Sequence, residues 1–421
     1  MDPPEVRPPS WPRRLAIDLG PLRRHVAFRR LFVGQTISTL GSEIAAVAAP
    51  YQLYQLTHST LQVGLLALCE LFPLLTLTIL GGAIADAFDR RLIALRTEVA
   101  LAAVAVLFAL NAGLEHPKVW AIYVLITVAM ALFSLGVASM RTVVPRLVEP
   151  DELAAANAIE SLYSSTTSVA GPALGGVLIA TLGLSGAYLF DAVTFLASIW
   201  SVYRLPALPP LHDVERPSLR SIAEGFRFVR RTKVLLGQFL VDSNAMIFGM
   251  PRALFPALAA GRFHGGATVV GILFAAPYAG ALASSLLSGP LARVRRQGLW
   301  VAVAAALWGI AIAGFGLARP LWLALLLLAA AGAADNVSAV LRSTILFTVT
   351  PDHLRGRLVG IEFAQVASTP ALGNVEAGLL ASLTSVRFSI VSGGLACVAG
   401  TILVALLVPA LIHYDAREPR S

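Results

Sequence analysis

Stretches of about twenty apolar residues recur along nearly the whole chain, and this recurrence limits the possible folds more than any other feature. A helix of that length spans the hydrocarbon core of a bilayer, and about twelve such spans fit the sequence. Hydrophobic residues make up 57% of the chain and charged residues 13%, so a water-soluble core of 421 residues would lack a polar surface. The short alternating patterns of an outer-membrane barrel are absent. The sequence therefore predicts an all-α polytopic membrane protein.

The basic residues predict how the chain is oriented in the membrane. Three of the 32 Lys and Arg residues lie inside apolar stretches, namely Arg141, Arg252 and Arg342. If the N-terminus is cytoplasmic, 25 of the others fall on the inner side and only four in outer loops: Lys118, Arg262, Arg319 and Arg387. This positive-inside bias predicts an inner-membrane protein with both termini in the cytoplasm. The net charge of +8 forms no continuous face outside the membrane, so nucleic acid is not an expected partner.

Cysteine and histidine give no sign of a disulfide, a metal site or a cofactor. Cys69 and Cys397 lie in apolar stretches far apart, without CxxC spacing, and are expected to be small core residues. The seven histidines lack metal-ligand spacing. Because nucleophile and base constellations at usable spacing are also missing, the chain is not expected to be an enzyme.

The chain is expected to contain two helical bundles between short tails. The predicted parts are a cytoplasmic tail at 1–26, a six-helix bundle at 27–204, a cytoplasmic linker at 205–232, a second six-helix bundle at 233–412 and a cytoplasmic tail at 413–421. In the linker, a helical pattern places Leu219, Ile222 and Phe226 on one face and arginines on others. This pattern favours a helix that lies on the inner leaflet, and a solvated linker is the alternative.

The two predicted bundles share a sequence pattern that indicates an internal duplication. Four matches follow one another along the chain at separations of 206, 201, 201 and 198 residues: Pro50 with Pro256, Arg141 with Arg342, Pro150-Asp151 with Pro351-Asp352, and Pro172-Ala-Leu-Gly175 with Pro370-Ala-Leu-Gly373. Colinear matches with a slowly drifting offset are typical of a parallel repeat, in which both copies have the same orientation.

A charged hairpin follows the second expected span and is nearly repeated after the eighth. The first copy is Gly82-Ala-Ile-Ala-Asp86-Ala-Phe-Asp89-Arg90-Arg91, and the degenerate copy is Gly289-Pro-Leu-Ala-Arg293-Val-Arg295-Arg296. Together with the duplication, this hairpin resembles the major facilitator superfamily over essentially the whole chain. Finer features resemble the branch that includes the enterobactin exporter and bacterial drug and macrolide efflux proteins: Ala27-Phe28-Arg29, Thr57-His58-Ser59-Thr60 and Phe255-Pro256-Ala257-Leu258.

The resemblance implies a gating role for the hairpin. In the superfamily this hairpin locks the cytoplasmic side during alternating access, and its residues here are Gly82, Asp86, Arg90 and Arg91. A signal that only fixes topology is the alternative. Asp89 replaces a usual glycine, and Arg293 stands where the first copy has an acid, so a second lock must be built differently. We also expect two repeated ion pairs at the inner gate, Arg141 with Glu160 and Arg342 with Glu362.

The fifth expected span carries Gly171-Pro172-Ala-Leu-Gly175-Gly176, which resembles the core of a motif found in antiporters of this superfamily. Proline kinks a helix and small residues allow helices to pack closely. Thr167 stands where the full motif has an earlier glycine, so the match is partial. The motif favours export, with a purely packing role as the alternative.

Polar and charged residues inside apolar stretches are candidates for the transport site because their desolvation is costly. The proton-coupling candidates are Glu43, Asp242 and Asp335, since a carboxyl group in a low dielectric can take up and release a proton. Permanent pairing of each with a nearby arginine is the alternative. The candidates for the substrate cavity, which the superfamily lines with spans 1, 4, 7 and 10, are Gln35, Ser38, Asn244, Arg252 and Asn336. Structural bonds between helices are expected for Glu70, Glu98 and Asp191.

No ATP-binding P-loop is present, so transport must draw its energy from an ion gradient or from the substrate itself. The resemblance implies a monomeric, proton-driven exporter of an amphiphilic small molecule, either a siderophore or a hydrophobic drug. Its expected partners are that molecule, protons and the lipid bilayer. The alternatives are a multidrug or macrolide efflux protein without a siderophore role, and a nutrient importer of the same fold.

Overall fold

The structure is a computed structural model, and it describes residues 18–87, 89–140, 143–206, 219–287, 289 and 294–415. Within these ranges all regular secondary structure is helical, which confirms the predicted all-α class. The first half contains α1 (Gly20–Arg24), α2 (Val26–Thr57), α3 (Thr60–Ala87), α4 (Arg90–Ala112), α5 (Val119–Met140), the short 3-10 helices η2 (Val144–Arg146) and η3 (Pro150–Glu152), and α6 (Leu153–Tyr203).

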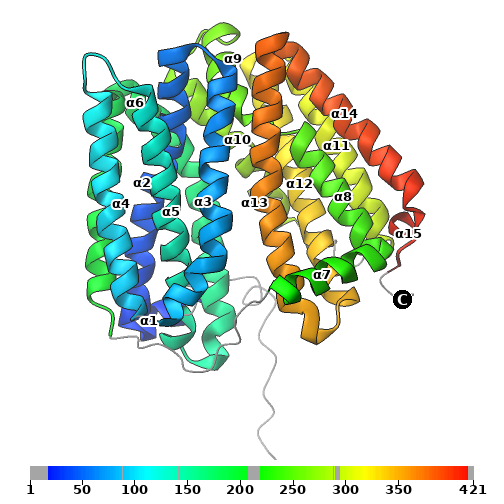
Figure 1. Ribbon diagram of the computed structural model, residues 1–421, viewed down its shortest axis with the longest axis horizontal. Helices are drawn as coiled ribbons and strands as arrows, with labels where there is room; N and C mark the ends of the chain where they lie inside the picture. Colours follow the sequence, from blue (N-terminus) through cyan, green and yellow to red (C-terminus); the bar gives the residue numbers. More distant parts are fainter. Residues whose placement is uncertain are drawn as a thin grey trace, which may run out of the picture.

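The second half begins with α7 (Leu219–Arg231), which occupies the place of the predicted surface helix. The remaining helices are α8 (Lys233–Phe248), η4 (Arg252–Leu254), α9 (Phe255–Gly261), α10 (Ala267–Leu286), α11 (Gln297–Leu317), α12 (Leu321–Val349), α13 (Asp352–Leu383), α14 (Val386–Leu407) and α15 (Pro409–Ile412). In Figure 1, α2 to α6 lie on the left, α8 and α11 to α15 lie on the right, and α3 and α13 lie beside one another in the middle.

The described helices provide the twelve expected spans. Ten helical segments are long and apolar enough to cross a membrane. One of them, Pro150–Tyr203, contains two helices, because Gly183 has a positive φ of 73° that interrupts α6 at the predicted outer turn. The twelfth span is α13, whose 32 residues include Glu362, Gln365 and Glu376 and are therefore less apolar than the other spans.

The seventh span covers Lys233–Gly261, but it is not one continuous helix. Helix α8 ends at Phe248 with Gly249 as its C-cap, and η4 and α9 follow as separate short helices. Pro251 and Pro256 explain the break, because proline removes a backbone donor and disfavours a helical conformation in the residue before it. The break carries Arg252 on η4.

The two halves approach each other most closely near the face that lies opposite both described chain ends. On one side α3 meets α13, where the Thr60 hydroxyl donates a hydrogen bond of 2.9 Å to the Gly378 carbonyl. On the other side α6 meets α10, where Gly176 and Gly271 lie so close that a Cβ atom on either would overlap the opposite backbone. Small residues at these positions let the backbones touch, so this face is closed.

The opposite face carries the chain ends and the surface helix. Arg24 and His25 bind the carboxylate of Glu152, at 2.9 and 2.5 Å, and hold the start of the described chain against the connection between α5 and α6. Helix α7 packs on α13, where Arg357 forms an ion pair of 2.7 Å with Glu224. Figure 1 shows α1 and α7 at this same end of the molecule.

Candidate functional site

A cavity of about 170 Å³ lies between the two halves, beneath the closed face. Helices α2, α3 and α6 contribute one wall, and η4, α10 and α13 contribute the other. Its charged, polar and aromatic lining residues are Glu43, Glu70, Arg252, Phe274, Tyr278 and Asn374. Both bundles therefore contribute charged, polar and aromatic groups to one cavity, at the position where transporters built from two repeats place their sites.

Glu43 lies in this cavity, at the contact between α2 and α6. The Ser168 hydroxyl donates a hydrogen bond to it over 3.4 Å, and Gly171 leaves room for its side chain. Arg252, from the opposite half, interacts with it electrostatically. Glu43 thus stands between a hydrogen-bond donor of its own bundle and a cation of the other bundle.

Arg252 is the cation of the cavity. Its guanidinium lies 5.0 Å from the ring centroid of Tyr278, which places it over an aromatic face. It interacts electrostatically with Glu43, Glu70 and Asp335, and so joins carboxylates from both halves. The Asn374 side chain accepts a hydrogen bond of 3.0 Å from the Ala253 amide and holds η4 against α13.

A second charged group lies inside the C-terminal half, around Arg342. Arg342 forms an ion pair with Asp242, which is only 5% exposed, and a longer contact of 3.8 Å with Asp335. The ion pair predicted between Arg342 and Glu362 is therefore not the one that this conformation contains, although Glu362 still interacts electrostatically with Arg342. Asp242 is the partner because its carboxylate lies in direct contact with the guanidinium and can neutralise it there.

Two of the predicted cavity residues hold helices together instead, and a third is buried within its own bundle. The Asn244 amide donates to the Cys397 carbonyl at 2.8 Å and so ties α8 to α14. The Asn336 amide donates to the Ser284 hydroxyl at 2.9 Å, between α12 and α10. Ser38 is buried in α2. Arg252 alone among the five candidates lines the central cavity, and the fifth, Gln35, lines a different one.

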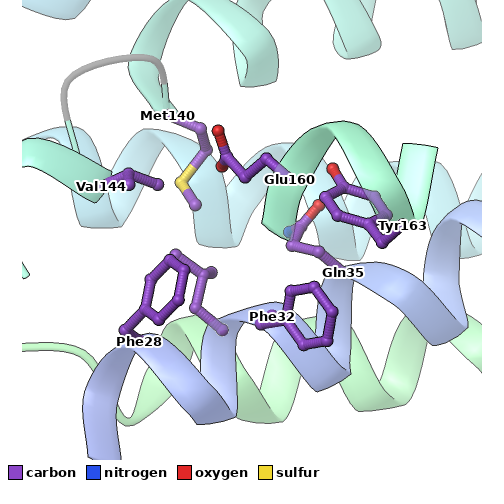
Figure 2. Close-up of a pocket in the computed structure, with 8 residues that line it drawn as sticks. Phe28, Phe32, Gln35, Met140, Val144, Glu160 and Tyr163 are labelled. Atoms are coloured by element: carbon purple, nitrogen blue, oxygen red, sulfur yellow. The ribbon is translucent and has the colours of Figure 1, made fainter. Parts of the chain in front are cut away.

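That other cavity, of about 90 Å³, lies within the N-terminal half near the chain-end face. Figure 2 shows the side chains that surround it: Phe28, Phe32, Gln35, Met140, Val144, Glu160 and Tyr163. Glu160, predicted as a gate residue, lines this cavity. Its predicted partner Arg141 lies outside the described residues.

The hairpin motif is described only in part. Helix α3 runs through Gly82 and Asp86, but their side chains lie outside the described part of the structure. Asp89, in place of the usual glycine, caps α4 by accepting a hydrogen bond of 2.9 Å from the Arg91 amide. Arg91 donates to the Tyr203 carbonyl at 2.5 Å, and Arg90 is buried. The motif thus binds the start of α4 to the end of α6.

The antiporter-type motif lies on α6 and contacts helices on two sides. Gly171 and Gly175 face Glu43 and Ile44 of α2, while Gly176 and the Pro172 carbonyl face Gly271 of α10. The motif therefore packs the first bundle against the second at the edge of the central cavity. Sequence reasoning missed that Glu70 and Tyr278 line this cavity, because the direction of a side chain from a long apolar helix depends on its packing.

Two packed helical bundles with twelve spans and a charged cavity between them define a multi-span membrane transporter. The sequence profile of the family described as transmembrane secretion effector matches residues 16–420, and the chain belongs to this family of the major facilitator superfamily. The predicted resemblance to that superfamily and the expectation of a transporter instead of an enzyme are both confirmed.

The chain is similar over nearly its full length to proteins named enterobactin exporters. One from Citrobacter koseri is 34% identical over 400 residues, which cover 94% of this chain and 95% of the relative. One from Escherichia coli K12 is 33% identical over 413 residues, which cover 98% of each.

Solved structures share the fold at low sequence identity. A bacterial homologue of the iron transporter ferroportin in an inward-facing state has a TM-score of 0.68 and 16% identity, covering 92% of this chain and 98% of that one. A mutant of the nucleoside transporter NupG has a TM-score of 0.72 and 11% identity, covering 91% of this chain and 99% of that one. These likenesses support the twelve-helix fold.

Proposed function

We propose that this protein exports a siderophore-like amphiphilic small molecule across the bacterial inner membrane by proton-coupled alternating access. The observation that carries the proposal is the cavity between the two bundles, in which Arg252 faces Glu43 and Glu70 and is flanked by Tyr278 and Phe274. Such a lining offers charge, hydrogen bonds and aromatic surface to one ligand. The full-length similarity to proteins named enterobactin exporters supports a siderophore as the substrate.

The closed face supports a transport cycle of two states. With both termini in the cytoplasm, as the basic residues favour, the closed face is the outer one and this conformation opens inward. The substrate then binds from the cytoplasm, and rocking of residues 27–204 against residues 233–412 exposes it outside. The linker at 205–232 and the hairpin around Asp86 and Arg91 would control access to the cavity from the inner side. The transporting unit would be one monomer.

Glu43 is our leading candidate for the group that couples this cycle to protons. Its only ionic neighbour among the described residues is Arg252, which also interacts electrostatically with Glu70 and Asp335. A proton on Glu43 would release Arg252 toward an anionic group of the substrate, and loss of that proton would restore the contact between the halves. Asp335 is the next candidate, and Asp242 ranks last because it already binds Arg342.

The test uses purified protein in liposomes with an imposed pH gradient. Enterobactin added on the cytoplasmic face should accumulate on the other side when that side is acidic, and an uncoupler should abolish accumulation. Transport of a macrolide but not of enterobactin would favour the drug-efflux alternative. Movement of enterobactin with the proton, in the same direction, would contradict export by antiport and favour the importer alternative.

A further inference from the structure

The N-terminal half contains a second acidic group that the central cavity does not include. Glu98 on α4 and Asp191 on α6 both face the interface that these helices form with α2. Asp191 is 4% exposed, and its Oδ1 atom points at Gly41 of α2 without a hydrogen-bond partner. The Oε2 atom of Glu98 is also buried and without a partner.

The neighbours of this pair bring no positive charge to it. From α2 it meets the amide of Gln35 and the backbone at Gly41, and from α6 it meets Ser198 and the phenol of Tyr188. Glu98 and Asp191 interact electrostatically with each other. Among the described residues no Lys, Arg or His interacts with either carboxyl group. This arrangement differs from Asp242 and Asp335, which share Arg342.

Two buried carboxylates that lack a cation are unstable as a pair of anions. Desolvation and mutual repulsion both favour the neutral, protonated form, and inside a membrane no bulk water offsets this cost. Gly41 lets α2 approach α6 closely at this point, because a Cβ atom there would overlap Thr194 Oγ1 and lie 2.7 Å from Asp191 Oδ1. A proton is the smallest ligand that satisfies such a site.

Gln35 connects this pair to the cavity near the chain-end face. Its amide donates to Glu98 at 3.2 Å and to the Ser198 hydroxyl at 2.9 Å, while the same side chain lines the cavity that Glu160 and Tyr163 also line. The cavity of about 90 Å³ has room for water molecules. Figure 2 shows Glu160 and Gln35 on the wall of this space.

We propose that Glu98 and Asp191 form a proton-binding site inside the N-terminal bundle, separate from the central cavity and supplied with protons through the cavity that Gln35 and Glu160 line. A role for this site in driving export rests on the proposed function. Proton binding itself does not, because it requires no substrate.

Infrared difference spectroscopy on the full-length protein in lipid nanodiscs tests the proposal without substrate. The wild type should show the carbonyl band of protonated carboxyl groups as the pH is changed between about 5 and about 9. Asp191→Asn and Glu98→Gln should each remove part of this band. The matched control Glu115→Gln, in an exposed loop, should leave it unchanged.

Three outcomes would overturn the proposal. In the first, the spectra of Asp191→Asn and Glu98→Gln superimpose on that of the wild type. In the second, the wild type itself lacks the band. In the third, excess calcium chloride abolishes the wild-type band, which would reveal a metal site. If Asp191→Asn does not fold, the spectra of Glu98→Gln and of the wild type still test the proposed proton-binding site. Failure of enterobactin transport with an intact carboxyl band would count against the proposed function alone.

Discussion

Arg342 and Arg252 are both partly buried arginines, but they are neutralised differently. Arg342 is fixed by a direct ion pair with Asp242, and its side chain is 11% exposed. Arg252 lies over Tyr278 and faces its carboxylates only through longer-range electrostatic interactions, without an ion pair among the described residues. A cation without a direct partner can exchange one carboxylate for another, so Arg252 suits a site that changes between states, while Arg342 suits a permanent support.

The first prediction concerns the ion pair between Arg342 and Asp242. Asp242→Asn leaves Arg342 with only the longer contact to Asp335, so the free energy of unfolding should fall by about 3 kcal/mol or more, as when one partner of a buried pair is lost. The midpoint of thermal unfolding in detergent should fall accordingly.

Two matched variants control this measurement. The double variant Asp242→Asn/Arg342→Met removes both charges and should recover most of the lost stability. Asp352→Asn breaks an exposed ion pair with Arg355 and should leave the midpoint unchanged. A single variant as stable as the wild type would show that Asp242 is not the needed partner.

The second prediction concerns Glu43. Glu43→Gln mimics the protonated carboxyl group, so accumulation of enterobactin driven by a pH gradient should fall by about tenfold or more, within the usual range of coupling between two sites. Exchange of enterobactin without a gradient should continue, because the cavity remains. Both rates are measured in the same liposomes. Undiminished accumulation would remove Glu43 as the coupling residue.

The sequence identified part of the central site. Glu43 and Arg252 were predicted from two properties together. Each is a charged residue inside an apolar span, where desolvation is costly, and each lies on a span that lines the cavity in the superfamily. Asn244 and Asn336 were assigned to the same cavity, yet they bind Cys397 and Ser284 in neighbouring helices. An amide can satisfy a buried backbone carbonyl as readily as a ligand, and only the packing of the helices decides which it meets.

Helix α6 is the element that links the site to the contact between the halves. Gly171 and Gly175 bring α2 close and thereby position Glu43, and Gly176 brings α10 close on the other side. A movement of α10 away from α6 would therefore change the packing of α6 within one or two turns of its contact with Glu43. The sequence of the partial antiporter motif predicts that it packs closely against other helices. It does not predict that these helices are α2 and α10.

The third prediction tests this close contact. In Gly271→Val the new side chain would overlap the Pro172 carbonyl and the backbone of Gly176, so α6 and α10 must separate and the closed face should open. Spin labels on Gln55→Cys and Thr384→Cys, which lie in the two halves at the closed face, should report a longer distance.

The control for this variant lies in α13. Gly360→Val meets open space, since nothing lies within 4 Å of a Cβ atom there, and the label distance should not change. An unchanged distance in Gly271→Val would show that this contact does not keep the face closed.

The helices themselves were largely predictable from apolar length, and the exceptions have identifiable causes. The break between Phe248 and Phe255 cannot be read from apolar length, because the apolar pattern continues through it, although Gly249 and Pro251 signal it. Within the described residues α13 was expected and is present, despite Glu362 and Glu376. Its polar residues are stabilised by contacts that no single-helix pattern contains, such as the hydrogen bond from Gln365 to Ser243.

For the molecule as a whole, the fourth prediction concerns orientation. In a variant that lacks Cys69 and Cys397, a membrane-impermeant thiol reagent should label Glu115→Cys in intact spheroplasts and Arg230→Cys only after permeabilisation. The opposite pattern would reverse the proposed topology, and with it the identification of the closed face as the outer one.

The two bundles, which the sequence predicts to be a parallel repeat, differ in how they neutralise their buried acids. In the described part of the chain, Asp242 is neutralised within its own bundle by Arg342, whereas Asp191 in the other bundle has no such counterion. Under the proposed proton site, a change of acidity would alter the charge of the N-terminal bundle at Asp191, while in the C-terminal bundle the ion pair with Arg342 keeps Asp242 neutralised.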